Sequence, residues 1–415
     1  MSSGISGTAG NAAGKIIDVE VITFRLPTRS HGTKWGYGQI GEQRDGVQTI
    51  TRISTNGGAV GYATGGVHSY FYGATAPEVE TLIKPLLVGQ DPWDRELLWN
   101  WMAQHRGISE RLLGNIDSAL WDLAGRVAGV SVAKLMGRAR EKAKAYASTA
   151  PNLGSPDVYA DLARSAKQRG YRAFKVHAYI FADPKTLEPT PGKPSSPRED
   201  VEVCEAVRDA VGPDMTLMHD PWGVYSYQEA VYVGRELERL GYYFFEHPMD
   251  ERRTEPYRRL CQELDIPVCS PELTDGLHFS RAEWVLQRAS DIGRIDVNFG
   301  GITACKKAVD MYESFGMPCE MHVGGFGNAA ILGATTAETC EFFERGLLYP
   351  DEDYDQTPLY LNSPCDPMDD EGFVHLPDGP GLGFDFNWDY INEHRIDGAN
   401  GPVFGDGSDG RQVLP

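Results

Sequence analysis

The spacing of apolar and polar residues changes character near residue 140. Before that point, the β-rich runs KIIDVEVITFRL, GVQTITRIST and AVGYAT are followed by segments with apolar residues at intervals of three and four, which is typical of helices. The last two runs flank Asn56, Gly57 and Gly58, a combination that favours a hairpin within an antiparallel meander. The pattern predicts an α+β domain over residues 16–140, and the Gly/Ser/Ala-rich residues 1–15 are interpreted as a flexible lead-in.

After residue 140, short apolar runs alternate with helical stretches. The alternation is typical of a parallel sheet, and its length predicts an α/β fold with a (β/α)8 barrel of the TIM type over residues 141–370. The remaining residues, 371–415, are rich in Gly, Pro and Asp and are expected to return to the first domain. The eight candidate strands span residues 143–149, 172–177, 215–220, 242–246, 267–272, 294–299, 318–323 and 340–344.

One connection in this series is irregular. The segment between the second and third candidate strands, including residues 181–200, contains five prolines and is interpreted as an inserted loop. Two interpretations remain open for it: a solvated surface excursion, or a flap beside the mouth of the barrel.

Overall charge and cysteine content limit the class of protein. The net charge of −20 argues against a nucleic-acid or anionic-membrane partner, although it does not exclude a small anionic substrate. No apolar run approaches the roughly 18 residues that a membrane-spanning helix needs. The seven cysteines include no C-x-x-C pair, so we expect reduced thiols in a cytoplasmic protein rather than a disulfide framework.

Acidic residues close three successive candidate strands. Asp220, Glu246 and Glu272 follow one another at intervals of 26 residues, and the carboxyl ends of barrel strands build the active site. Each like-charged pair would cost roughly 4 kcal/mol at a separation of about 4 Å and an effective dielectric constant near 20. A bound divalent cation removes this cost, and all-oxygen ligation selects Mg²⁺ or Mn²⁺. The alternative is that the three acids are solvated separately.

The sixth and seventh strands add a carboxylate and an imidazole. Asp296 and His322 are also 26 residues apart, and a carboxylate beside an imidazole fixes its tautomer and raises its basicity. We interpret His322 as a general base; the alternative is a histidine of the core. Glu344 closes the eighth strand. Lys175 and His177 share one face of the second strand and are expected across the mouth from His322, with the cation between them.

Other residues near these strand ends have plainer interpretations. The segment HVGGFGNAA resembles a dinucleotide-binding fingerprint, but it follows the seventh strand of the series instead of opening a βαβ unit. We interpret Gly324 and Gly325 as residues that let the backbone turn tightly. His219 and His247 flank predicted ligands, so strand alternation is expected to point them away from the mouth, into core or helix-packing positions.

Taken in order, these residues resemble the enolase superfamily, mandelate racemase/muconate lactonizing enzyme group, over roughly residues 16–390. The segments NIDSALWDLAGRVAGVSVAKLMG (115–137) and DGPGLG (378–383) are similar to motifs of that group. The resemblance implies abstraction of the proton alpha to a carboxylate with Mg²⁺, and a first domain that caps the barrel. It implies that the loop carrying Trp35, Tyr37 and Arg44 closes over the substrate, and that the protein is a dimer or octamer.

Three positions depart from the group's pattern. His177 replaces the second lysine of a K-x-K motif, Trp222 stands where many relatives have Asn or His, and His247 follows Glu246 in place of an acid. Losing the lysine weakens the case for a racemase, which needs a base on each face of the substrate. Trp222 is expected to bind substrate and to reshape the pocket.

We therefore expect dehydration of an acid sugar, an aldonate or aldarate, to a 2-keto-3-deoxy acid. In this hypothesis His322 removes the alpha proton, and His177 or the newly protonated His322 gives a proton to the departing hydroxyl. Lys175 holds the substrate carboxylate or stabilises the enediolate, and Glu344 hydrogen-bonds the carboxylate. The alternatives are a racemase, epimerase or cycloisomerase acting on a hydroxy acid or sugar lactone, and a non-catalytic binding protein.

Overall fold

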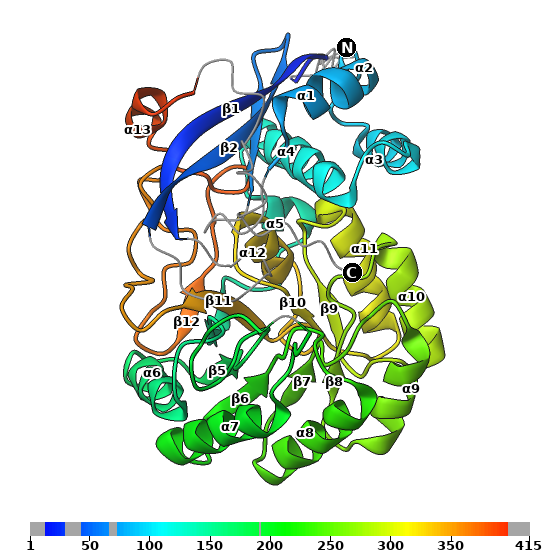
Figure 1. The fold of residues 1–415 in the computed structure, drawn as a ribbon. Helices are drawn as coiled ribbons and strands as arrows, with labels where there is room; N and C mark the ends of the chain where they lie inside the picture. Colours follow the sequence, from blue (N-terminus) through cyan, green and yellow to red (C-terminus); the bar gives the residue numbers. More distant parts are fainter. Residues whose placement is uncertain (1–12, 30–42, 66–72, 191, 397–415) are drawn as a thin grey trace, which may run out of the picture.

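The structure is a computed structural model that describes residues 13–29, 43–65, 73–190 and 192–396. An α+β unit lies on top of a barrel of alternating strands and helices (Figure 1). Of the residues expected to close over a substrate, Trp35 and Tyr37 lie outside the described residues. Arg44 falls in a strand of the upper unit, but its side chain is not among those described.

The upper unit is built on the predicted meander, an antiparallel sheet in the order β1-β2-β3. The turn between its last two strands is closed by the Thr55 amide, which donates to the carbonyl of Ala59 at 3.0 Å, and Gly58 adopts a φ of +82° there. The elements of this unit are β1 (Ile16–Arg29), β2 (Gln43–Thr55), β3 (Val60–Thr64), α1 (Ala76–Glu78), η1 (Val79–Ile83), α2 (Lys84–Leu87), α3 (Arg95–Gln104), α4 (Glu110–Ala128) and α5 (Val132–Met136).

Each of the eight predicted ranges overlaps a strand of the barrel. Six strands pair in parallel in the order β11-β4-β5-β6-β7-β8, and β9 pairs in parallel with β10. A bridge between Cys269 and Ile292 connects the two sets on one side. The strands are β4 (Lys142–Thr149), β5 (Ala173–Val176), β6 (Thr216–His219), β7 (Phe244–Glu246), β8 (Val268–Cys269), β9 (Gly293–Ile295), β10 (Cys319–Met321) and β11 (Phe342–Leu348).

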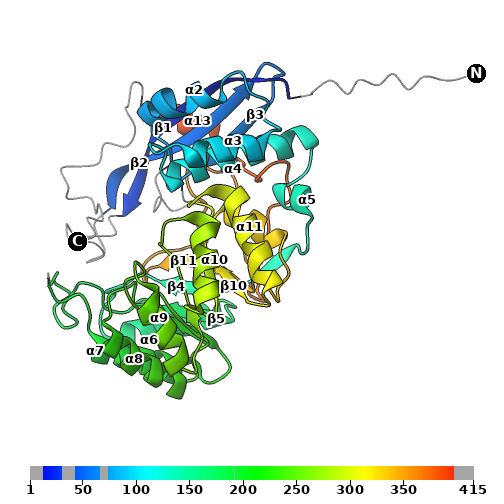
Figure 2. The ribbon, with the colours of Figure 1, turned by 90° about the vertical axis from the view of Figure 1, so that its right-hand side faces the viewer.

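Helices cover the outside of these strands (Figure 2). Each has an apolar face that packs on the barrel; in α8, for example, Ala230, Val233 and Leu237 are buried at intervals of three and four residues. The helices are α6 (Pro156–Gln168), α7 (Pro197–Val211), α8 (Tyr227–Arg239), α9 (Thr254–Glu263), α10 (Leu277–Gln287), α11 (Gly301–Ser314) and α12 (Phe326–Gly333).

The last described segment connects the two units. β12 (Phe373–His375) pairs antiparallel with β4, and α13 (Trp388–Glu393) lies beside β1 (Figure 1). The Arg25 amide donates to the carbonyl of His394 at 2.9 Å, and the Ile396 amide donates to the carbonyl of Thr23 at 2.8 Å. The chain thus returns to the sheet of the upper unit after it leaves the barrel.

Helix α4, which carries the NIDSALWD motif, joins the upper unit to the barrel. Asp117 accepts hydrogen bonds from the amide and hydroxyl of Thr303 at 2.9 and 2.7 Å, at the first turn of α11. Asp122 accepts from the Leu382 amide at 2.7 Å. Both aspartates are fully buried, so the motif fixes how the upper unit sits on the barrel.

The inserted loop folds back on itself. Isolated bridges join Ile180 to Ser195 and Ala182 to Pro189, and the Phe181 amide donates to the carbonyl of Pro194 at 3.0 Å.

All seven cysteines are free thiols. Within the described residues, no helix combines the length and the apolar character that crossing a membrane requires.

Candidate active site

Charged side chains fill the barrel interior just below its mouth. Lys175, on β5, places Nζ 2.8 Å from Glu246 Oε2, 2.9 Å from Glu344 Oε1 and 3.4 Å from Asp220 Oδ2. Burial alone would lower the pKa of Lys175, but Glu246 and Glu344 hold it above its usual value. Asp220, Glu246 and Glu344 therefore approach one another around a lysine ammonium.

Arg294 is a member of this network that the sequence analysis missed. Its Nε lies 2.6 Å from Glu246 Oε1, its Nη2 lies 2.5 Å from Glu344 Oε2, and its Nη1 donates to the carbonyl of Met321 at 2.6 Å. The side chain is fully buried. The sequence could have indicated this position, because Arg294 is two residues before Asp296 and therefore points to the same face of the strand as that aspartate.

The third ligand position is where the structure departs from the prediction. Asp220, Glu272 and His247 each offer a ligand atom within 4.8 Å of the others, and all three residues are buried. Both oxygens of Glu246, the expected member, instead face Arg294 and Lys175. Two buried carboxylates with a third donor fit a hard divalent cation such as Mg²⁺.

The prediction that His247 points away from the mouth was wrong. Its backbone has a φ of +39°, which breaks the alternation of the strand, and its Nδ1 lies 2.7 Å from Glu272 Oε2. Burial alone would lower the pKa of His247, but Glu251 and Glu272 raise it to about 10. The core position predicted for His219 is confirmed: its Nε2 lies 3.1 Å from the hydroxyl of Tyr225, and its ring stacks on Phe245.

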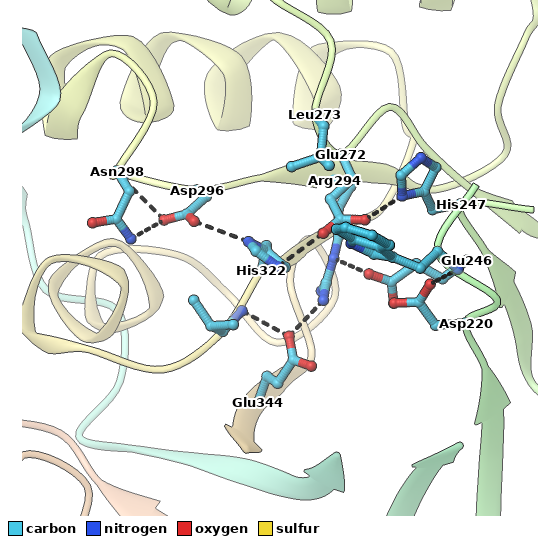
Figure 3. Close-up of polar contacts among 12 residues, drawn as sticks. Asp220, Glu246, His247, Glu272, Leu273, Arg294, Asp296, Asn298, His322 and Glu344 are labelled. Atoms are coloured by element: carbon cyan, nitrogen blue, oxygen red, sulfur yellow. Dashed lines mark hydrogen bonds and ion pairs between the residues drawn. The ribbon is translucent and has the colours of Figure 1, made fainter. Parts of the chain in front are cut away.

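His322 lies between two carboxylates (Figure 3). Its Nδ1 is 2.9 Å from Asp296 Oδ2 and its Nε2 is 2.8 Å from Glu272 Oε1. Burial alone would lower the pKa of His322, but Glu272 and Asp296 raise it to about 10. The carboxylate of Asp296 accepts from Nδ1, which leaves Nε2 as the nitrogen that can exchange a proton with a substrate.

His177 contacts two groups that can only accept hydrogen bonds. Its Nδ1 is 2.7 Å from the carbonyl oxygen of Thr149, and its Nε2 is 2.9 Å from Asp220 Oδ2. The carbonyl oxygen of Thr149 can only accept a hydrogen bond, so Nε2 is the ring nitrogen that faces Asp220. Burial alone would raise the pKa of Asp220, but His177 and Lys175 lower it to about 2.

A pocket at the barrel mouth brings most of these groups together. Trp222 lies on its rim with a φ of +57°, and its amide donates to Asp220 Oδ1 at 2.8 Å. The pocket is lined by Pro151, Lys175, His177, Ile180, Trp222, Glu272, His322, Val323, Glu344 and Leu347. Ile180 is at the base of the inserted loop, so this loop starts beside the mouth.

Comparisons with known proteins agree with this arrangement. Residues 18–137 match the family of mandelate racemase / muconate lactonizing enzyme N-terminal domains, and residues 158–390 match the enolase C-terminal domain-like family. The crystal structure of D-glucarate dehydratase from Agrobacterium tumefaciens complexed with magnesium is 38% identical, with a TM-score of 0.84 over 92% of this chain and 100% of that chain.

Two curated relatives extend the comparison. Arabinonate dehydratase of Saccharolobus solfataricus is 30% identical over 360 residues, which cover 83% of this chain and 90% of the relative. D-galactarolactone cycloisomerase of Agrobacterium fabrum is 29% identical over 333 residues, which cover 75% of this chain and 82% of the relative. This chain, an α+β domain on a (β/α)8 barrel, therefore belongs to the mandelate racemase/muconate lactonizing enzyme group of the enolase superfamily.

Proposed function

We propose that this chain is a Mg²⁺-dependent acid-sugar dehydratase that converts an aldonate or aldarate into a 2-keto-3-deoxy acid. The observation that carries the proposal is His322, held by Asp296 at Nδ1 while Nε2 faces the pocket. The names of the relatives support the substrate class, since they include arabinonate and D-glucarate dehydratases.

His322 is the proposed base. To accept the alpha proton, its Nε2 must give up the 2.8 Å contact with Glu272, and a substrate entering the pocket displaces that contact. Asp296 stabilises the imidazolium that forms and keeps the ring in one orientation. General-base assistance of this kind is worth roughly a hundredfold to ten-thousandfold in rate.

His177 is the proposed acid for the departing beta hydroxyl, and the newly protonated His322 is the other candidate. We favour His177 because it lines the pocket and its Nδ1 is held by the carbonyl oxygen of Thr149, which leaves Nε2 as the nitrogen that can give a proton. Lys175, which lines the pocket, is proposed to hold the substrate carboxylate and the charge that develops on it. Glu344, which also lines the pocket, is proposed to hydrogen-bond that carboxylate, a role for which Glu344 must first take up a proton because an ionised carboxylate can only accept.

Asp220 and Glu272 are the proposed metal ligands, with Glu246 as the third, and Mn²⁺ is an alternative ion. When bound, the ion would supply Lewis-acid stabilisation to the carboxylate of the substrate. We favour Glu246 over His247 because a hard divalent cation prefers oxygen ligands to an imidazole nitrogen. Both Asp220 and Glu246 already share the ammonium of Lys175, so their oxygens face one point in the barrel.

An isomerase remains the second candidate, because a cycloisomerase is among the relatives and the first step is shared. His177 favours dehydration over racemisation, because it stands in place of the second lysine of the K-x-K motif, which would be the base on the other face of the substrate.

The test is incubation with Mg²⁺ and a panel of aldonates and aldarates in D₂O, followed by NMR and mass analysis of the products. We expect loss of one water and a 2-keto product for at least one sugar. A deuterated product of unchanged formula would favour the isomerase. If no sugar in the panel exchanged its alpha proton, a non-catalytic binding protein would be the interpretation that fits.

The remaining parts of the proposal concern the whole molecule. We propose a capping domain over 16–140, a barrel over 141–370 and a returning segment over 371–415. A dimer or octamer is proposed from the resemblance and can be measured by light scattering. The free thiols support a cytoplasmic location.

A further inference from the structure

The glycine-rich segment after β10 brings an asparagine against the proposed base and its carboxylate. Asn328, on α12, is 1% exposed. Its Nδ2 lies 3.1 Å from Asp296 Oδ1, 2.8 Å from the carbonyl oxygen of His322 and 3.1 Å from that of Val323. Its Oδ1 accepts from the Val297 amide at 3.0 Å. One side chain thus connects the end of β9 with the end of β10.

A second asparagine completes the arrangement around Asp296. The amide and the side-chain Nδ2 of Asn298 donate to Asp296 Oδ1 at 2.9 and 2.8 Å (Figure 3). Oδ1 therefore receives N–H groups from both asparagines, while Oδ2 is left for His322. Because these donors carry no charge, they fix the carboxylate without cancelling the negative charge that His322 responds to.

The glycines explain how the chain reaches this position. A side chain at Gly327 would place its Cβ 2.6 Å from Val297 Cγ2, and one at Gly324 would place it 2.9 Å from the ring of Phe343. Gly325 has a φ of +133°, which side chains rarely allow. The segment that resembles a dinucleotide fingerprint in sequence is, in the structure, a tight turn that delivers Asn328.

We propose that Asn328, together with Asn298, is a positioning residue for proton abstraction: it holds Asp296 in the orientation that keeps Nε2 of His322 toward the substrate. The inference rests on the proposed function, since that function makes His322 the base. Misplacing a reacting group by about 1 Å can cost roughly a hundredfold in rate.

The test compares Asn328→Asp, Asn328→Leu and Asn298→Ala with the wild type. Asn328→Asp keeps the size and the acceptor for Val297 but replaces the donor to Asp296. We expect kcat and the rate of alpha-proton exchange to fall about a hundredfold in both Asn328 variants, with KM changed less than about threefold. Asn298→Ala keeps its backbone donor, so a loss of only about threefold is expected. An exchange rate within twofold of the wild type in Asn328→Asp would overturn the proposal.

A second readout needs no substrate and so separates this inference from the proposed function. In histidine-labelled protein, NMR detects the Nδ1 proton that His322 donates to Asp296, and His322→Asn identifies the signal. We expect the signal in the wild type and its broadening or loss in Asn328→Asp. An unchanged signal would contradict the positioning role even if every sugar in the panel failed to react. Thermal unfolding shows whether Asn328→Leu folds. If that variant does not fold, the result with Asn328→Asp alone decides whether the positioning role holds.

Discussion

The two sides of the barrel mouth hold their carboxylates by different means. On one side, which we call the ionic side, Glu246 and Glu344 are bound by the ammonium of Lys175 and the guanidinium of Arg294. On the other, the amide side, Asp296 is bound by Asn298 and Asn328. Cations cancel the charge of the acids that they fix, whereas amides fix an acid and leave its charge in place. The second arrangement thus leaves Asp296 able to stabilise the imidazolium of His322.

The two kinds of partner also contribute different amounts to the free energy of unfolding. Removing one partner of a buried ion pair leaves a charge without compensation, which costs about 3–5 kcal/mol. Replacing a neutral donor costs less stability, about 1–3 kcal/mol, and mainly frees the acid to rotate. Changes on the ionic side should therefore lower stability or metal affinity, and changes on the amide side should lower the rate of proton transfer.

Metal removal should have the largest effect. Treatment with EDTA is expected to reduce turnover about a thousandfold or more, because a Lewis acid at the substrate carboxylate is worth several kcal/mol. Readdition of Mg²⁺ should restore it. The Nδ1 proton signal of His322 should persist in the chelated protein, since Asp296 is held by Asn298 and Asn328. Undiminished turnover after chelation would contradict the metal-dependent mechanism.

The substitution Arg294→Met should destabilise the fold by about 3–5 kcal/mol, because it removes the guanidinium that pairs with both Glu246 and Glu344. Urea unfolding measures the change. The matched control is Arg258→Met, since Arg258 pairs with Glu255 at 2.7 Å on the exposed surface, where such a pair contributes little to stability. Equal stability losses in the two variants would mean that the buried network does not hold the ionic side together.

Substitutions at the two candidates for the third metal ligand are expected to have the smallest effects, and they distinguish between Glu246 and His247 as that ligand. Glu246→Gln should weaken Mg²⁺ binding by more than about a hundredfold, whereas His247→Asn should weaken it about tenfold, by loosening Glu272. Isothermal titration of Mg²⁺ into each variant measures both. If His247→Asn gave the larger loss, the ligand set would be Asp220, His247 and Glu272.

Much of this arrangement could be predicted from the sequence because it follows from regular repetition. The strand–helix alternation placed a strand overlapping each expected range, and steps of 24 to 26 residues placed Asp220, Glu246, Glu272, Asp296 and His322 at neighbouring strand ends. In a parallel barrel those ends meet at one mouth, so sequence spacing translates directly into proximity.

The rest depends on local backbone geometry that spacing does not reveal. His247 turns toward Glu272 because its φ is positive, and no pattern in FFEHP indicates that. Asn328 reaches Asp296 only because three glycines remove side chains that would collide with their neighbours or strain the turn. Arg294 could have been recognised as an inward cation, but its partners depend on which acids face it across the barrel.

The most direct test of the account is alpha-proton exchange by His322→Asn on a substrate of the wild type, followed in D₂O with Mg²⁺ present. Asparagine keeps a polar group near Asp296 but cannot accept the proton, so we predict a loss of exchange of at least about a hundredfold at saturating Mg²⁺. Thermal unfolding checks that the variant is folded. Exchange at the wild-type rate would contradict the assignment of His322 as the base.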